Sequence, residues 1–594
     1  MKSFPKTVLA VMCGILVMNI LGLIIALFVF GSLLSAGSST PVLPRSGVLR
    51  MDMSAMTVVE RPSAESEFQS LFGGSVSQVG LWELVQSIDA AAADPSVSYI
   101  YLKPEGGSTS VAHLEEIRKA LSRFRESGKP VISFIENPDT RSYYLASVAD
   151  KVYMSSNSGA TPMIVGVGTQ LFFLKDLLDK LGVNVQLIRH GKYKSAGEMY
   201  VRSSASAENL EQNQAMVNSI WNSLADEICE SRGMDVATLS GLIDNLSLND
   251  ASDMLEYDLV DSVLDRNELR EKLAALAMVP SFKELSFIPM QDYVKVKGVQ
   301  NIAAKDQIAV VYADGEIVDG YGTGNVAGDL FASEIAKIRE DESVKAVVLR
   351  VSSPGGSVVA SDKIRTELEL LAGSKPLIAS YGDYAASGGY WISAGCDRIF
   401  SDRTTLTGSI GCFSMIPDFS ATADKVLHIG VTTVGASRHT GMYSGMGPLD
   451  REETAYMQKS VENIYDRFIS VVAEGRNLEE DYVDSIGQGR VWTGADALGI
   501  NLVDETGTLR DAVIYAAMCA SDGDPDLSKW NIQAYPKPLS LMESLMESFG
   551  SGSDALNDVF EGTAFENFAR AFSGWSHDKS EHFYARMPYG IVIR

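Results

Sequence analysis

The chain has 594 residues, a length that suggests more than one domain, and its composition of 46% hydrophobic and 21% charged residues is typical of a globular protein. Its formal charge of −26 repels a phosphate backbone, so the sequence predicts no nucleic-acid partner. The five cysteines form no CxxC pair and the six histidines show no HxxxH or HxH spacing. We therefore expect no metal site, no cofactor and no disulfide framework.

A long apolar stretch lies near the start of the chain. Residues 7–34 carry no charge and exceed the roughly 20 residues that a helix needs to cross a bilayer core, so we expect one transmembrane helix within residues 1–40. Lys2 and Lys6 precede it and favour a cytoplasmic N-terminus. The rest of the chain would then lie outside the cytoplasm. The alternative interpretation is a signal peptide cleaved near "SAGSS", residues 35–39.

The remainder of the chain contains an internal repeat. The stretches "SVSYIYLKPEGG…DKVYMS" and "SVKAVVLRVSSPGG…DRIFS" share one succession of strand, glycine turn, amphipathic helix, strand and helix. Strands that alternate with helices predict βαβ units in an α/β fold. We therefore expect two tandem α/β domains, residues 47–295 and 306–520, with long helices in the segments 205–245 and 450–480. Residues 538–594 are expected to form an amphipathic tail.

Comparison of the two copies separates two candidate catalytic residues. Ser387, in "GDYAASGGYWISAG", has no counterpart at a permissive turn in the first copy, where the segment reads "NPDTRSYYL". Conversely, "GKYKSAGE" in the first copy carries Lys192 and Lys194, where the second copy has Thr440 and Met442. Alone, each candidate has an ordinary interpretation, a turn serine or a solvated surface lysine. Their complementary distribution predicts a serine–lysine dyad shared between the repeats.

A lysine acts as a general base only when it is neutral. Because its ordinary pKa is about 10.4, the site has to lower that pKa by several units through burial. Paired glycines follow the first strand of each copy, and backbone N–H groups at such turns can stabilise an oxyanion. We interpret Gly106 and Gly107 as a tight turn, and Gly355 and Gly356 as part of a functional site.

The motifs "SPGGSV", "YAASGGYWIS", "TGSIG" and "GKYKSA" together resemble the signal peptide peptidase A family, also called protease IV. The resemblance is to its long, two-repeat, membrane-anchored bacterial form and covers nearly the whole chain. It implies a fold of the Clp-protease/crotonase type, with Ser387 as nucleophile and Lys194 as general base.

The resemblance also implies supporting residues. The backbone N–H of Gly356 or Gly355, together with that of Gly388 beside Ser387, would form the oxyanion hole. Three hydroxyl groups would orient the amine of Lys194, those of Thr407, Ser409 and Ser195.

Substrate and location are likewise implied by the resemblance. The protein would sit in the inner membrane with its bulk on the periplasmic side, degrade cleaved signal peptides and other apolar peptides, and form a homotetramer. Two alternatives stay open. A crotonase-like acyl-CoA enzyme would need acidic general bases, and a membrane-anchored scaffold would bind peptides without cutting them.

Overall fold

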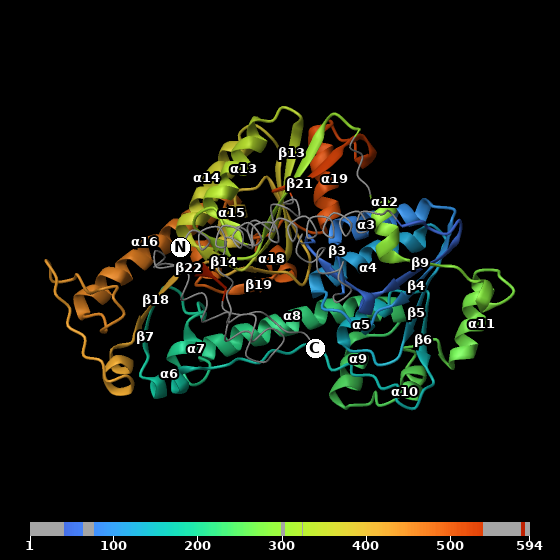
Figure 1. The fold of residues 1–594 in the computed structure, drawn as a ribbon, viewed down its shortest axis with the longest axis horizontal. Coiled ribbons are helices and arrows are strands. Elements are labelled where there is room, and N and C mark those ends of the chain that lie inside the picture. Colours follow the sequence, from blue (N-terminus) through green and yellow to red (C-terminus); the bar gives the residue numbers. More distant parts are fainter. Residues whose placement is uncertain (1–40, 63–75, 299–302, 323–324, 538–583, 588–594) are drawn as a thin grey trace, which may run out of the picture.

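Two parallel β-sheets of the same design lie one in each sequence repeat (Figure 1). The computed structural model describes residues 41–62, 76–298, 303–322, 325–537 and 584–587. The first sheet has the strand order β8-β6-β5-β4-β1-β9, and all neighbouring strands are parallel. Its strands are β1 (Gly47–Asp52), β4 (Val97–Lys103), β5 (Val131–Ile135), β6 (Lys151–Ser155), β8 (Ser262–Leu264) and β9 (Phe287–Pro289).

The second sheet repeats that order as β20-β16-β15-β13-β10-β21. Its strands are β10 (Gln307–Asp314), β13 (Val344–Ser353), β15 (Leu377–Ala386), β16 (Arg398–Ser401), β20 (Glu505–Thr506) and β21 (Asn531–Tyr535). Because the six strands correspond one to one in chain order and in space, the two predicted α/β repeats are confirmed. Strand β21 follows the expected range 306–520 and completes this sheet. Two short strands, β17 (Leu406–Gly408) and β19 (Val491–Thr493), extend the sheet beside the carboxyl end of β15.

Each repeat contains one helix of 26 residues, α8 (Ala207–Arg232) and α16 (Arg451–Arg476), in the segments where long helices were predicted. The Ser206 side chain caps the N-terminus of α8, and Gly233 ends the helix in the left-handed conformation. The principal other helices are α3 (Leu81–Ala93), α4 (Val111–Glu126), α5 (Thr140–Ala146), α13 (Gly328–Glu340), α14 (Val358–Ala372), α15 (Gly388–Ser393) and α19 (Leu509–Ala520).

A third sheet joins the two repeats to the C-terminal part of the chain, in the order β12-β11-β14-β22-β18-β7. Strand β7 (Asn184–Arg189) belongs to the first repeat and pairs antiparallel with β18 (Phe413–Asp418) of the second. The other strands are β11 (Ile317–Val318), β12 (Val326–Ala327), β14 (Gly355–Ser357) and β22 (Tyr584–Arg586). This pairing brings the segment after β7, which contains Lys194, to the second repeat.

The repeats also share a hydrophobic core. Ala386, Leu406 and Val491 of the second repeat are buried in a cluster formed mainly by the first repeat. Conversely, Trp82 of α3, a first-repeat residue, is buried in a cluster formed otherwise by Ile308 and other residues of the second repeat. Buried apolar surface contributes about 25 cal/mol per Å². Apolar packing therefore stabilises the arrangement in which the repeats contact each other.

Charged side chains are buried where the repeats meet. Arg350 on β13 forms ion pairs with two residues of the first repeat, Glu60 at 2.9 Å and Glu116 at 2.8 Å. Glu60 also pairs with His113 at 3.1 Å. Burial alone would raise the pKa of Glu60, but the charges of Arg350 and His113 lower it to about 2. The carboxylate of Glu60 is therefore ionised and links the repeats through Arg350.

Two predicted segments lie wholly or mostly outside the described residues. The expected transmembrane helix falls within residues 1–40, which the structure does not describe. Among the helices of the described residues, none combines the length and apolar character needed to span a bilayer. Of the expected amphipathic tail, residues 538–594, the structure describes 584–587. There the chain forms strand β22, because its backbone pairs with β14 and β18.

Candidate active site

Ser387 occupies the sharp turn between β15 and α15. Its φ of 56° and ψ of −113° are seldom adopted by residues with a side chain, so the backbone here is strained. A hydrogen bond from Ser387 N to Gly408 O, 2.8 Å long, holds the turn. The next residue is glycine because a Cβ at Gly388 would lie 2.7 Å from Ser361 Oγ. This turn fixes Ser387 at the carboxyl end of β15.

Lys194 reaches Ser387 from the other repeat. It lies in the turn after β7, and its side chain has no exposed surface. Its Nζ is 2.8 Å from Ser387 Oγ, 3.0 Å from Ser409 Oγ and 3.1 Å from Ser409 O. The two predicted dyad residues, 193 positions apart in the chain, are thus within hydrogen-bonding distance. Lys192, in contrast, is exposed, and its Nζ lies 5.0 Å from the centre of the Tyr193 ring.

The backbone around Lys194 is held by contacts from both repeats. Arg189 Nη1 donates to Lys194 O at 2.6 Å, and Tyr193 N donates to Gln488 O at 2.9 Å. Gly489 has a φ of +78°, and a Cβ there would lie 2.6 Å from Lys194 N. Sequence reasoning missed Gly489. The available signal was the pair of glycines around Gln488, in "GQGR" just before "VWTGADALG".

Burial sets the protonation state of Lys194. Loss of solvent lowers its pKa from 10.5 to about 7, an effect that Cys412 opposes. An exposed lysine is neutral in only about one molecule in 3,000 at pH 7, whereas a lysine with a pKa of about 7 is neutral in about half. The amine of Lys194 can therefore accept a proton near neutral pH. An arginine could not, because its guanidinium stays charged.

The three glycines predicted for an oxyanion hole lie together beside Ser387. A Cβ on Gly388 would lie 3.1 Å from Gly356 N, and one on Gly355 would lie 2.6 Å from Gly388 N. The N–H of Gly355 donates to Ser353 Oγ at 3.2 Å. This leaves the N–H groups of Gly356 and Gly388 as the pair that can bind one carbonyl oxygen. Gly355 instead contributes a φ of +97° and a backbone that lies close to Gly388 N, which a side chain at this position would prevent.

The corresponding glycines of the first repeat are exposed and lie in a bend of the chain. Gly106 and Gly107 have φ values of +79° and +86°. A Cβ on Gly107 would lie 2.5 Å from Met53 O. At the place of Ser387, the first repeat begins α5 with an ordinary capping box between Asp139 and Ser142. The first repeat therefore has no strained serine turn at this place.

The three hydroxyl groups predicted to orient Lys194 lie in different surroundings. Ser409 contacts Lys194 Nζ through both its hydroxyl and its carbonyl oxygen. Thr407 Oγ1 donates to Ala385 O at 2.7 Å and so ties β17 to β15. Ser195 Oγ accepts a hydrogen bond from Gln212 at 3.1 Å.

Comparison of the chain with known proteins shows the family to which it belongs. The model described as Peptidase family S49 matches residues 123–280 and 369–521, one segment in each repeat. "Protease 4" of Haemophilus influenzae is 35% identical over 526 residues, covering 85% of this chain and 84% of that protein. "Serine protease SPPA, chloroplastic" of Arabidopsis thaliana is 29% identical over 520 residues, covering 86% of this chain and 75% of that protein.

One solved structure among the matches is ClpP1 from Listeria monocytogenes. It has a TM-score of 0.22 and 15% identity, and covers 34% of this chain and 92% of that chain. A similarity at that level does not establish a shared fold, so the Clp-protease/crotonase type of fold stays a prediction.

The α/β fold of two repeats and the family matches in both define a class, the serine peptidases. Within that class, the chain belongs to peptidase family S49 and is a homologue of Protease 4 over about 85% of its length. The family predicted from the sequence motifs is therefore confirmed.

Proposed function

We propose that this protein is a membrane-anchored serine endopeptidase that degrades cleaved signal peptides and similar apolar peptides. The observation that carries the proposal is the 2.8 Å distance between Lys194 Nζ and Ser387 Oγ. Both side chains have no exposed surface, so the amine is held in a state suited to proton transfer. Membership of family S49 supports the reaction. The choice of substrate is supported by the name of one further relative, "Putative signal peptide peptidase SppA" of Enterococcus faecium.

In the proposed reaction the neutral amine of Lys194 takes the proton of the Ser387 hydroxyl as Oγ attacks a peptide carbonyl carbon. The N–H groups of Gly356 and Gly388 bind the resulting oxyanion, an effect worth about 2.7–4 kcal/mol per donor in other enzymes. Lys194 then gives its proton to the departing amine, and water hydrolyses the acyl-serine ester by the reverse sequence. Ser409 orients Nζ through its two oxygens.

Location and assembly are part of the same proposal. The uncharged residues 7–34 support a single anchor in the inner membrane, with the bulk of the chain on the periplasmic side. The segment after β18, which projects at the left of Figure 1, supports association between copies of the chain because it carries exposed apolar side chains, and the number of four copies rests on the family resemblance alone. They are Val426, Leu427, Ile429, Val431, Val434, Tyr443 and Met446.

The experiment is a cleavage assay with two fluorogenic peptides of equal length, one apolar and one polar, in the same detergent. We expect the full-length protein to cut the apolar peptide faster. Ser387→Ala should lower kcat by at least about 10⁴-fold, as removal of a nucleophile does in other serine peptidases. An unchanged melting temperature would show that this variant is folded.

Three outcomes would contradict the proposal. Equal rates for both peptides would refute the apolar preference, and activity retained by Ser387→Ala would refute the nucleophile. Binding of the apolar peptide by the wild type without cleavage would instead support the alternative function, a membrane-anchored scaffold that binds peptides without cutting them.

A further inference from the structure

Of the two long helices, only α8 buries amide side chains. Its buried residues include Asn209, Gln212 and Asn213, whereas the buried residues of α16 are all apolar or aromatic. The buried face of a helix is ordinarily apolar, and a buried amide is tolerated where its hydrogen-bonding groups are paired. The amides are thus a feature of the repeat that carries Lys194.

Gln212 binds the residues on both sides of Lys194. Its Nε2 donates to Tyr193 O at 3.2 Å and to Ser195 Oγ at 3.1 Å. Gln212 is 2% exposed, so solvent does not compete for these hydrogen bonds. Because a glutamine amide has two N–H groups, both of its donors are used on the turn that carries Lys194.

The same amide group also binds the second repeat, where β19 lies alongside α8 (Figure 1). Gln212 Oε1 accepts a hydrogen bond from Val491 N at 3.0 Å. Val491 is the partner of Gly408 in the ladder between β19 and β17, and Gly408 O accepts from Ser387 N at 2.8 Å. One side chain thus connects the Lys194 turn, through two short strands, to the backbone of Ser387.

The residue before Val491 holds the second partner of the Lys194 amine. Arg490 O accepts a hydrogen bond from Ser409 N at 2.7 Å, and Ser409 Oγ lies 3.0 Å from Lys194 Nζ. The position of Gln212 against β19 therefore affects two distances from Nζ, one to Ser387 and one to Ser409.

A neighbouring amide of α8 supports the same turn from another direction. Asn209 Nδ2 donates to Glu198 Oε2 at 3.1 Å, and Glu198 pairs with Arg189 at 3.1 Å. Burial alone would raise the pKa of Glu198, but hydrogen bonds from Ser206 and the charge of Arg189 lower it, so the carboxylate is ionised. Arg189 in turn donates to Lys194 O. The first two turns of α8 therefore hold the lysine turn through buried polar contacts.

We propose that Gln212 is a positioning residue, which fixes the Lys194 turn against β19 so that Nζ stays within hydrogen-bonding distance of Ser387 Oγ. This inference rests on the proposed function, and it adds how a dyad divided between two repeats is kept together. Loss of the amide would let the turn move, and a displacement of about 1 Å can lower a rate by about 100-fold. Movement of the turn would also admit solvent to Nζ, and the pKa of Lys194 would rise toward that of an exposed lysine.

The test is cleavage of the apolar peptide by Gln212→Met in the full-length protein, measured across pH and well below the melting temperature. Methionine keeps the length and helix propensity of glutamine but has no N–H donor and no amide oxygen. We expect kcat to fall by about 100-fold, with KM within about twofold of the wild type. The midpoint of the rise in kcat/KM should lie at least about one pH unit above that of the wild type.

Gln214→Met is the matched control on the same helix. Gln214 is exposed, and its Nε2 donates to Asn218 Oδ1 at 2.8 Å, so this variant should keep the wild-type kcat and midpoint. Gln212→Glu decides the question if Gln212→Met does not fold. Its carboxylate keeps the acceptor for Val491 N but loses the donors to the turn, and its negative charge favours protonated Lys194. Its midpoint should therefore also rise.

The outcomes separate this inference from the proposed function. Wild-type kcat and midpoint in a folded Gln212 variant, or equal effects of Gln212→Met and Gln214→Met, would overturn the inference and leave the proposed function intact. A lower melting temperature of Gln212→Met with an unchanged midpoint would mean that Gln212 only stabilises the fold, which also overturns it. Failure of the wild type to cut the peptide would refute the proposed function itself.

Discussion

Lys194→Ala is expected to lower kcat for the apolar peptide by about 10⁴-fold or more, because it removes the group that accepts the Ser387 proton. The melting temperature should stay the same or rise. The wild type has to bury an amine that carries a charge at low pH, and the variant does not. The measurement is kcat at saturating peptide together with thermal unfolding of the same preparation.

The matched control for that variant lies two residues away. Lys192 is on the same turn but exposed, so Lys192→Ala should keep kcat within about twofold of the wild type. Equal losses in the two variants would mean that the turn as a whole matters and not the Lys194 amine. Full activity in Lys194→Ala would exclude the dyad.

Arg350→Met is expected to destabilise the folded protein by roughly 3–5 kcal/mol, because it removes the buried cation that pairs with both Glu60 and Glu116 and leaves Glu60 with His113 alone. The effect should appear as a lower midpoint of urea unfolding. Since Arg350 joins the two repeats, loss of peptidase activity should accompany or precede unfolding, as Lys194 separates from Ser387.

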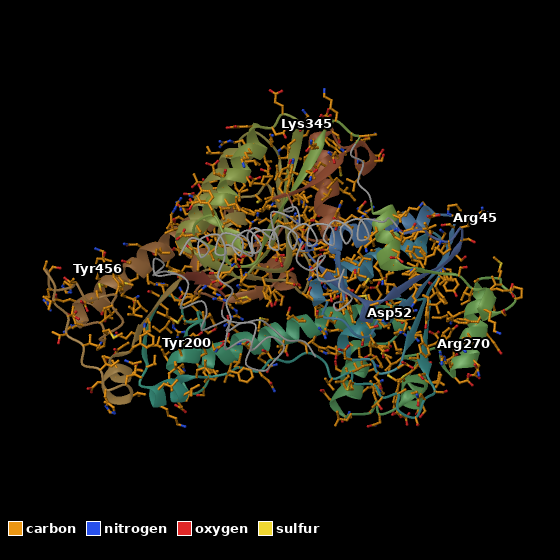
Figure 2. The ribbon with its side chains drawn as sticks, in the orientation of Figure 1. Arg45, Asp52, Tyr200, Arg270, Lys345 and Tyr456 are labelled. Carbon is orange, nitrogen blue, oxygen red and sulfur yellow. The ribbon has the colours of Figure 1, made fainter. Side chains whose placement is uncertain are left out.

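Lys345→Met is the control on the same strand. Lys345 lies at the outer end of β13, away from the first repeat, as Figure 2 shows. Its side chain is 43% exposed and its ion pair with Asp306 is 3.7 Å long, so its removal should change stability by less than about 0.5 kcal/mol. Similar losses of stability in Lys345→Met and Arg350→Met would contradict the role given to the buried charges.

The dyad was predictable because the chain carries two copies of one unit. Ser387 and Lys194 each stand out only where the other copy lacks them, so the comparison indicated that the repeats have to meet. The alternation of strands and helices predicted the α/β fold for the same reason, since both copies show it. Hydrophobic pattern and repetition are properties of the chain itself and can be read without coordinates.

Other parts of the site depend on contacts that no local pattern reveals. Position 489 has to be glycine because a Cβ there would collide with the backbone of Lys194, a residue far away in the chain. The local sequence "GQGR" does not indicate that Lys194 is the residue in contact. Strand β22 has three residues, too few to show an alternating pattern, and its position follows from pairing with β14 and β18. The hydroxyl of Thr407 could not be assigned from its motif, because its bond to Ala385 depends on the pairing of β17 with β15.

The pH dependence of kcat/KM for the apolar peptide tests most directly whether neutral Lys194 is the base that activates Ser387. Below the pKa of Lys194 the amine is protonated and cannot accept a proton, so activity should rise with pH. The account predicts a rise with a midpoint near 7, the value that burial gives this lysine. A midpoint near pH 10, as for an exposed lysine, or no rise between about pH 6 and pH 10 would contradict it.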